Sequence, residues 1–289
     1  MTPSIGVVFP PWYPPEQLRD AARAAEETGV DQLWLWEDCF KESGIAAAAA
    51  SLAWTERLTV AIGLVPAPLR NVALLAMEVA TLERLFPGRF VPVVGHGVQS
   101  WMGQVGGRVE SPLTLLREYV VALSRLLAGE TVTTSGRYVS LDAVALDWPP
   151  QQPVPVLGGG VGPRTLELLG EVAGGVLLDS RNSPSEVLAA LELVDSGARR
   201  AGRARPSVAL LLLTVRGESA RERLASYVGE LSGDPATEKG LAGDAATVAA
   251  GIRRYAEAGV GTVALTPPED EPDIVGWIRW VGTEVMPRV

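Results

Sequence analysis

Short apolar runs alternate with longer amphipathic stretches along the whole chain. The runs have strand length, and the stretches carry apolar residues at helical spacing, such as Leu18, Ala22 and Ala25. The strands predicted from these runs are 5–9, 32–36, 58–65, 90–94, 154–157, 175–178, 207–215 and 261–266. The helices predicted between and after them are 14–28, 46–54, 71–85, 112–127, 163–172, 184–201, 244–258 and 273–286, with further helical material up to Tyr227.

Strands that alternate with helices indicate a parallel sheet. Eight such units predict closure into a (β/α)₈ TIM barrel of the α/β class, with its active site at the carboxyl ends of the strands. Two insertions are expected: a hairpin over 131–139, after strand four, and a Gly/Asp/Pro-rich stretch after strand seven. An open doubly wound sheet is the alternative, but no Gly-x-Gly-x-x-Gly fingerprint follows the first strand. No linker divides the chain, so residues 1–289 are expected to form a single domain.

Composition narrows the possible partners. The chain has 47% hydrophobic residues and a formal net charge of −9, which favours a globular protein and argues against nucleic acid or an anionic membrane as partner. We find no run of membrane-span length and no basic region at the start, so a cytoplasmic location is expected. Cys39 is the only cysteine and His96 the only histidine, so neither an intrachain disulfide nor a metal site is expected.

Candidate chemistry follows the predicted strands. His96 lies between Gly95 and Gly97 after the fourth strand, and its imidazole ordinarily titrates near neutrality. It is either a pocket residue or only a hydrogen-bonded loop residue. Glu37 and Asp38 follow the second strand; in an extended chain they point to opposite sides, so at most one is expected to face the pocket.

The most distinctive strand end is the glycine-rich segment 158–162, followed by Pro163 and Arg164. Exposed backbone N–H groups at the start of a helix bind anions, so this segment predicts a phosphate site, with a flexible turn as the alternative. Trp12, Trp36 and Trp101 also fall at strand ends, and their faces suit a flat heteroaromatic ligand. Trp34 and Trp54 are assigned to the core.

Five segments, in this order and spacing, resemble the bacterial luciferase-like monooxygenase superfamily of flavin- and deazaflavin-dependent TIM barrels. They read AAEETGVDQLWLWED, ATLERLFPGRF, VGHG, LLREYV and LGGGVGPRTLEL. Each motif is weak alone, but the resemblance covers nearly the whole chain.

The resemblance implies FMN or coenzyme F420 at the carboxyl face of the barrel, with its ring against the ends of strands two, three and four. It also implies a cis peptide at Gly63-Leu64 that forms a bulge behind the ring, and it implies a homodimer. The cofactor-binding residues expected on this basis are Glu37, Gly63, Leu64, Gly95, His96, Gly97, Gly160, Val161, Gly162, Pro163 and Arg164.

The chain departs from one branch of that family. Deazaflavin-dependent sugar-phosphate dehydrogenases place His after strand two and Glu after the strand-four glycines, where this chain has Asp38 and Val98. We therefore expect an F420-dependent oxidoreductase or monooxygenase, with FMN as the second choice, that moves hydride between cofactor C5 and a small organic substrate. His96 and Asp38 are the candidate catalytic residues. A non-catalytic cofactor-binding paralogue and a barrel hydrolase or lyase are the alternatives.

Overall fold

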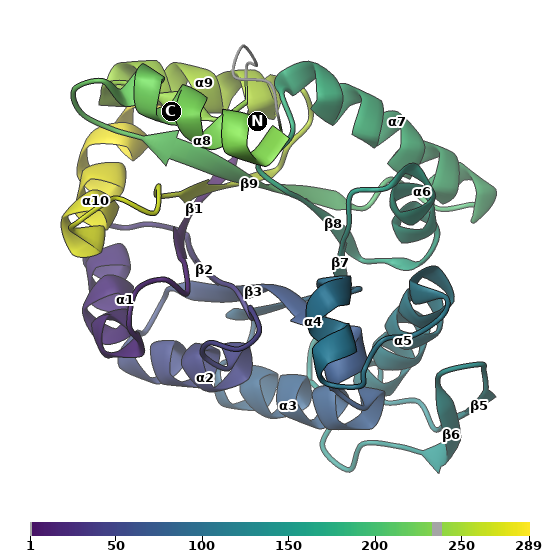
Figure 1. Ribbon diagram of the computed structural model, residues 1–289. Coiled ribbons are helices and arrows are strands. Elements are labelled where there is room, and N and C mark those ends of the chain that lie inside the picture. The colour runs from purple at the N-terminus through teal and green to yellow at the C-terminus, as the bar shows by residue number, and fades with distance from the viewer. Residues whose placement is uncertain (1, 233–238) are drawn as a thin grey trace.

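The computed structural model describes residues 2–232 and 239–289 as a closed parallel barrel surrounded by helices (Figure 1). The eight barrel strands are β1 (Ser4–Phe9), β2 (Gln32–Leu35), β3 (Thr59–Pro66), β4 (Phe90–Gly95), β7 (Leu157–Gly159), β8 (Gly175–Leu178), β9 (Ser207–Val215) and β11 (Thr262–Thr266). Each strand pairs in parallel with its neighbours, and the β8–β9 and β1–β11 pairs complete the ring. The predicted TIM barrel is thus confirmed.

Helices cover the outside of this barrel. The longer ones are α1 (Leu18–Glu27), α2 (Gly44–Trp54), α3 (Val72–Leu85), α5 (Pro112–Leu127), α6 (Pro163–Val172), α7 (Pro184–Arg200), α8 (Ala220–Ser232), α9 (Ala245–Glu257) and α10 (Ile274–Trp280). Polar caps start several of them; Ser183 and Glu186 form a reciprocal capping box at α7, and the side chains of Asn71 and Asp244 accept N–H groups of α3 and α9. The predicted helix positions are therefore largely confirmed.

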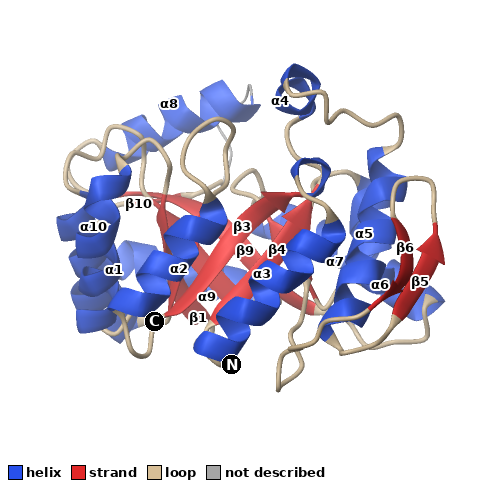
Figure 2. Cartoon of the chain, turned by 90° about the horizontal axis from the view of Figure 1, so that it is seen from below, coloured by secondary structure: helices blue, strands red, loops and turns tan. Residues whose placement is uncertain are grey.

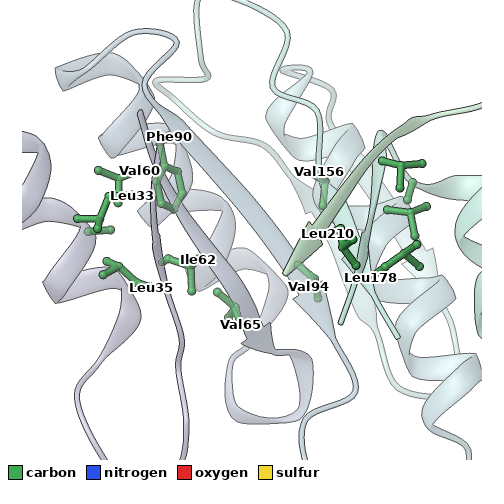
Figure 3. Packing of buried hydrophobic residues seen from close by; sticks show 14 of the residues in the cluster. Leu33, Leu35, Val60, Ile62, Val65, Phe90, Val94, Val156, Leu178 and Leu210 are labelled. Atoms are coloured by element: carbon green, nitrogen blue, oxygen red, sulfur yellow. The ribbon is translucent and has the colours of Figure 1, made fainter. Parts of the chain in front are cut away.

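Two apolar layers hold the barrel. Strand residues such as Leu33, Ile62 and Val94 point outward and pack under the helices (Figure 3). Inside the barrel, Trp34 is 1% exposed and packs with Ala61 and other small or aliphatic residues. Space for this indole comes from two glycines: a Cβ at Gly6 would lie 2.7 Å from Trp34 Cδ1, and one at Gly63 would lie 3.0 Å from Trp34 Cε3. Trp34 is a core residue, as predicted.

The fifth strand lies later in the chain than predicted. The structure begins β7 at Leu157 and includes Gly158 and Gly159, whereas we expected a strand over 154–157 and a loop from Gly158 onward. Close packing explains why this strand ends in glycine. A Cβ at Gly158 would lie 2.1 Å from Leu169 Cδ2, and one at Gly159 would lie 2.7 Å from Leu64 Cδ2.

The insertion after β4 also differs in detail. A hairpin is present, but its strands are β5 (Val132–Ser135) and β6 (Ser140–Val144), so it extends beyond the predicted range of 131–139. The Glu118 carboxylate on α5 organises this turn by accepting three backbone N–H groups, those of 137–139. A short helix, α4 (Gln99–Gln104), was not predicted. After β9 the chain forms α8 and the two-residue strand β10 (Leu241–Ala242), and part of the predicted second insertion, 233–238, lies outside the described residues.

One end of the barrel carries the carboxyl ends of all its parallel strands. Figure 2 shows α4 and α8 on one side of the barrel and both chain termini on the other. Since α4 follows the carboxyl end of β4, that side is where the strand-end residues gather. No helix in the described chain is long and apolar enough to cross a membrane.

Candidate functional site

A cavity of about 390 Å³ lies at the carboxyl ends of β2, β3, β4, β7, β8 and β9. Much of its wall is apolar and comes from Trp36, Leu64, Pro66, Val98, Trp101, Val161, Leu177 and Leu211. The ionisable residues that line the cavity are Glu37, Asp38, His96, Asp179 and Arg181. A largely apolar cavity with a few polar groups is typical of a small-molecule or cofactor site.

One wall of the cavity is a bulge in β3. The Gly63-Leu64 peptide bond is cis, as expected from the family resemblance, and the pairing of β3 with β4 shifts register between Ile62 and Val65. Both Gly63 and Leu64 line the cavity. The Leu64 side chain reaches across to β4 and β7, where a Cβ at Gly95 would lie 2.5 Å from Leu64 Cδ2. Gly95 therefore supports the wall from behind rather than lining it.

His96 extends this wall from the end of β4. The Nε2 atom is buried and has no hydrogen-bond partner within the described chain, while the backbone carbonyl of His96 accepts the Gln99 side-chain amide at 3.2 Å. Burial lowers the pKa of His96, so the imidazole is neutral at pH 7. Gly97, with φ of 68°, packs against Met102 and Pro66 and also lines the cavity. A neutral imidazole with an unused nitrogen can accept or donate a hydrogen bond to a ligand.

Glu37 and Asp38 both line the cavity, but the Glu37 carboxylate is turned to Gly44 and Arg70, which fits the expectation that at most one of the two acids faces the pocket. Strand β2 ends at Leu35, so both acids lie in the following loop rather than in the strand. Their surroundings differ. Burial raises the pKa of Asp38, and Lys41 only partly opposes this. The Glu37 carboxylate accepts the Gly44 N–H at 2.7 Å and pairs with both terminal nitrogens of Arg70.

Arg70 is the centre of a buried cluster behind the cavity wall. Besides Glu37, it contacts Glu78 of α3, with Nε 3.1 Å from Oε2. The Glu37 and Arg70 side chains are only 8% and 14% exposed. Burial raises the pKa of Glu78, and it raises the pKa of Tyr119, whose hydroxyl has no hydrogen-bond partner among the described residues. This cluster joins the loop after β2 to α3.

The loop after β7 leads from the cavity to the start of α6. Gly160 and Val161 line the cavity, whereas Gly162, Pro163 and Arg164 do not. Pro163 is the first residue of α6, and no side chain caps that helix. Within the described chain the N–H groups of Val161 and Gly162 donate to no protein acceptor. The loop therefore offers free N–H donors at a helix start, and the Arg164 side chain beside it is exposed.

Asp179 and Arg181 were not among the predicted site residues. They follow β8, and their side chains pair, with Arg181 Nε 2.7 Å from Asp179 Oδ2. Their place after a strand is the only sequence signal for them, and it does not separate them from other loop residues. Of the three aromatic candidates, Trp36 and Trp101 line the cavity, and Trp12 packs edge-on against Trp36 with ring centroids 5.5 Å apart. No cluster of metal-ligating side chains occurs among residues 2–232 and 239–289.

Known proteins are similar to this chain in sequence and in fold. It is 30% identical over 201 residues to 5,10-methylenetetrahydromethanopterin reductase from Methanolobus tindarius, covering 69% of this chain and 61% of that protein. It is 30% identical over 205 residues to F420-dependent glucose-6-phosphate dehydrogenase from Nakamurella multipartita, covering 66% and 60%. The chain thus spans about 60% of the length of these two relatives.

A solved structure extends the likeness of fold to the whole chain. An F420-dependent secondary alcohol dehydrogenase in complex with an F420-acetone adduct superposes with a TM-score of 0.88 at 24% identity, covering 100% of this chain and 99% of that one. The family model of luciferase-like monooxygenases matches residues 9–239. This chain belongs to the luciferase-like monooxygenase family.

Proposed function

We propose that this chain is an F420-dependent oxidoreductase whose cofactor ring occupies the cavity at the carboxyl ends of the barrel strands. The observation that carries the proposal is the combination of the Gly63-Leu64 bulge with a free-amide glycine loop on the same cavity. F420 is preferred over FMN because a relative at 30% identity is named as F420-dependent. FMN is the second candidate, since a structure of the same fold contains it.

The residues present fit such a cofactor. The cavity offers apolar surface and two indoles for a flat ring, and the buried Nε2 of His96 lacks a protein partner. The N–H groups of Val161 and Gly162 suit a phosphate group, and Arg164 can add charge. Glu37 would contribute through its main chain, because its carboxylate is held by Arg70 and Gly44.

The reaction class we propose is hydride transfer between the cofactor and a small organic substrate. Bound F420 supplies a ring carbon that exchanges hydride. The chain's own part is to hold the substrate and move its proton. His96 Nε2 is placed to accept the proton of a substrate hydroxyl or to hydrogen-bond its oxygen, and the Asp38 carboxyl group is the second candidate for proton transfer.

A second candidate function is cofactor binding without catalysis. It is favoured by Asp38 and Val98, which occupy the places where sugar-phosphate dehydrogenases of this type carry an acid/base pair. An isolated protein that binds F420 but does not oxidise or reduce any tested alcohol, ketone or enone would favour this alternative.

The test is a titration of the purified protein with F420 and with FMN, followed by quenching of tryptophan and cofactor fluorescence. We expect saturable binding of F420, weaker binding of FMN, and loss of F420 affinity when Gly160 is replaced by a bulky residue such as Leu. Failure of both cofactors to bind would refute the proposed function.

We also propose that residues 1–289 act as one domain, in the cytoplasm, as a homodimer. Support for the dimer comes from α3, whose outer side exposes Leu74 by 46%, Met77 by 58% and Leu85 by 65%. Apolar side chains of this size at helical spacing are typical of a surface that another chain covers. The alanine-rich helix α2 precedes α3 in the chain.

A further inference from the structure

We propose that the substrate of this cavity is uncharged and largely apolar, and that substrates bearing a phosphate or carboxylate group are disfavoured by charge. This inference rests on the proposed function, which places the substrate in the same cavity as the cofactor ring. It goes further because it assigns the chemical class of the substrate from the charges in the cavity wall.

The first observation is that the cations at the cavity are already paired. Arg181 is the only arginine or lysine in the described cavity wall, and its guanidinium pairs with the Asp179 carboxylate through Nε and Nη2. Behind the wall, Arg70 is shared between Glu37 and Glu78. Partial burial lowers the pKa of His96 and so favours its neutral form. An anionic substrate therefore meets no unpaired cationic side chain in the described cavity wall.

The Asp179 carboxylate stays beside Arg181 when an anion approaches. Asp179 has its own anchors, since Oδ1 accepts the Arg181 backbone N–H at 3.1 Å and the Asn182 side-chain amide at 3.2 Å. The carboxylate therefore stays at the cavity mouth even if the guanidinium moves. A phosphate or carboxylate bound to Arg181 would lie beside it and suffer like-charge repulsion.

The second observation is that the remaining charge is negative and the remaining surface is apolar. Asp38 lines the cavity without a hydrogen bond to its carboxyl group, and the exposed Lys41 is its only nearby cation. Trp36, Trp101 and Leu211 contribute indole and aliphatic surface. Such a wall binds a neutral molecule through apolar contact and leaves Asp38 and His96 for one oxygen or hydrogen.

The test compares two probes of equal size, benzamide and benzoate, by ligand-observed NMR and calorimetry at pH 7, with the protein alone and saturated with F420. We expect benzamide to bind at least tenfold more tightly than benzoate, and Trp101→Ala to weaken that binding. In Asp179→Asn, which frees Arg181, benzoate should gain at least fivefold in affinity while benzamide stays within twofold. Asp195→Asn is the matched control, because it frees Arg205 from a similar pair that does not line the cavity.

Equal or tighter binding of benzoate to the unmodified protein would overturn the proposal. So would failure of both probes to bind, or an Asp179→Asn variant with unchanged benzoate affinity. The F420 titration is a separate test. If F420 does not bind but the protein still prefers benzamide over benzoate, the proposed function is refuted and the charge selectivity of the cavity is not.

Discussion

His96 and Asp38 face the same cavity from opposite sides of the β3 bulge, and both are partly buried ionisable groups. Burial favours the neutral form of each group, because it lowers the pKa of the imidazole and raises the pKa of the carboxyl group. The imidazole can exchange a proton with a substrate near neutral pH, and the Asp38 carboxyl group is the second candidate. At the level of single residues, His96 and Asp38 are therefore the candidates for proton transfer to and from the substrate.

Replacing His96 by Ala should lower turnover with F420 by at least about tenfold, because Nε2 is the unpartnered proton acceptor of the cavity. The melting temperature should change little, since the imidazole makes no hydrogen bond to the described chain. His96→Gln, which keeps a polar side chain, is the control and should bind F420 normally. Undiminished turnover in His96→Ala would remove this residue from the mechanism.

Asp38→Asn should make the protein more stable and less active. The folded-state pKa of Asp38 lies above its ordinary value of 3.8, so the folded chain holds the proton more tightly than the unfolded chain. The free energy of unfolding therefore falls as pH rises through this interval, and the amide removes that loss. We expect a melting temperature higher by about 2 °C at pH 7 and unchanged below the ordinary pKa. Scanning calorimetry across pH measures this, and a lower melting temperature at pH 7 contradicts it.

The residue identities could be predicted from the sequence, but their surroundings could not. His96 and Asp38 were found because each follows an apolar run, and parallel barrels bring such strand ends together. Nothing in the sequence indicated that Glu37 would be paired with Arg70, which lies on another loop and is brought close only by folding. Asp179 and Arg181 were missed for the same reason, because their pairing at the cavity has no local sequence pattern.

At the scale of elements, the loop after β2 is held by charge rather than by regular structure. Glu37 accepts the Gly44 N–H at the start of α2 and pairs with Arg70, which in turn contacts Glu78 on α3. A Cβ at Gly44 would lie 3.1 Å from Glu37 Oε2, so glycine allows this close approach. The same loop contributes Trp36 and Asp38 to the cavity, so the cluster fixes part of the site.

Arg70→Met should destabilise the protein by about 3–5 kcal/mol, because it leaves the buried Glu37 carboxylate unpaired. Adding Glu37→Gln should recover about half of the loss, since the glutamine oxygen can still accept the Gly44 N–H. Urea unfolding measures both variants. Arg279→Met is the matched control; its exposed pair with Glu27 should contribute less than about 1 kcal/mol. Equal losses in the Arg70 and Arg279 variants would show that the cluster does not hold the loop.

The positions of helices and strands could be predicted where the sequence has a clear hydrophobic periodicity. Helix α5 has the predicted bounds, with Pro112 at its first position and apolar residues on one face. The position of the fifth strand was predicted wrongly because two of its three residues are glycines, which have low strand propensity. Glycine is needed at these two positions because the side chains of Leu64 and Leu169 pack against them. Helix α4 is too short to show a clear periodicity, although it brings Trp101 to the cavity.

At the scale of the whole molecule, the barrel places one cavity at the carboxyl ends of its strands and leaves the outer side of α3 apolar. The closed fold could be predicted from eight alternating units, because closure follows from their number. The apolar surface proposed for the dimer could not be predicted from the periodic pattern, because the sequence of α3 does not distinguish its exposed apolar residues from its buried ones.

Met77→Glu should convert the proposed homodimer into a monomer, because it places a charge in the centre of the exposed apolar side of α3. Light scattering after gel filtration gives the mass directly. Leu188→Glu, on the exposed side of α7, is the control and should leave the mass unchanged. A monomeric mass for the unmodified protein would refute the dimer.

The most direct test of the account is a crystal structure of the protein with bound F420. We predict density for the deazaflavin ring against Gly63 and Leu64, with its phosphate at the N–H groups of Val161 and Gly162 and with His96 beside the ring. A ring bound elsewhere on the barrel, or a cavity without cofactor at saturating F420, would contradict the central claim that this cavity is the cofactor site.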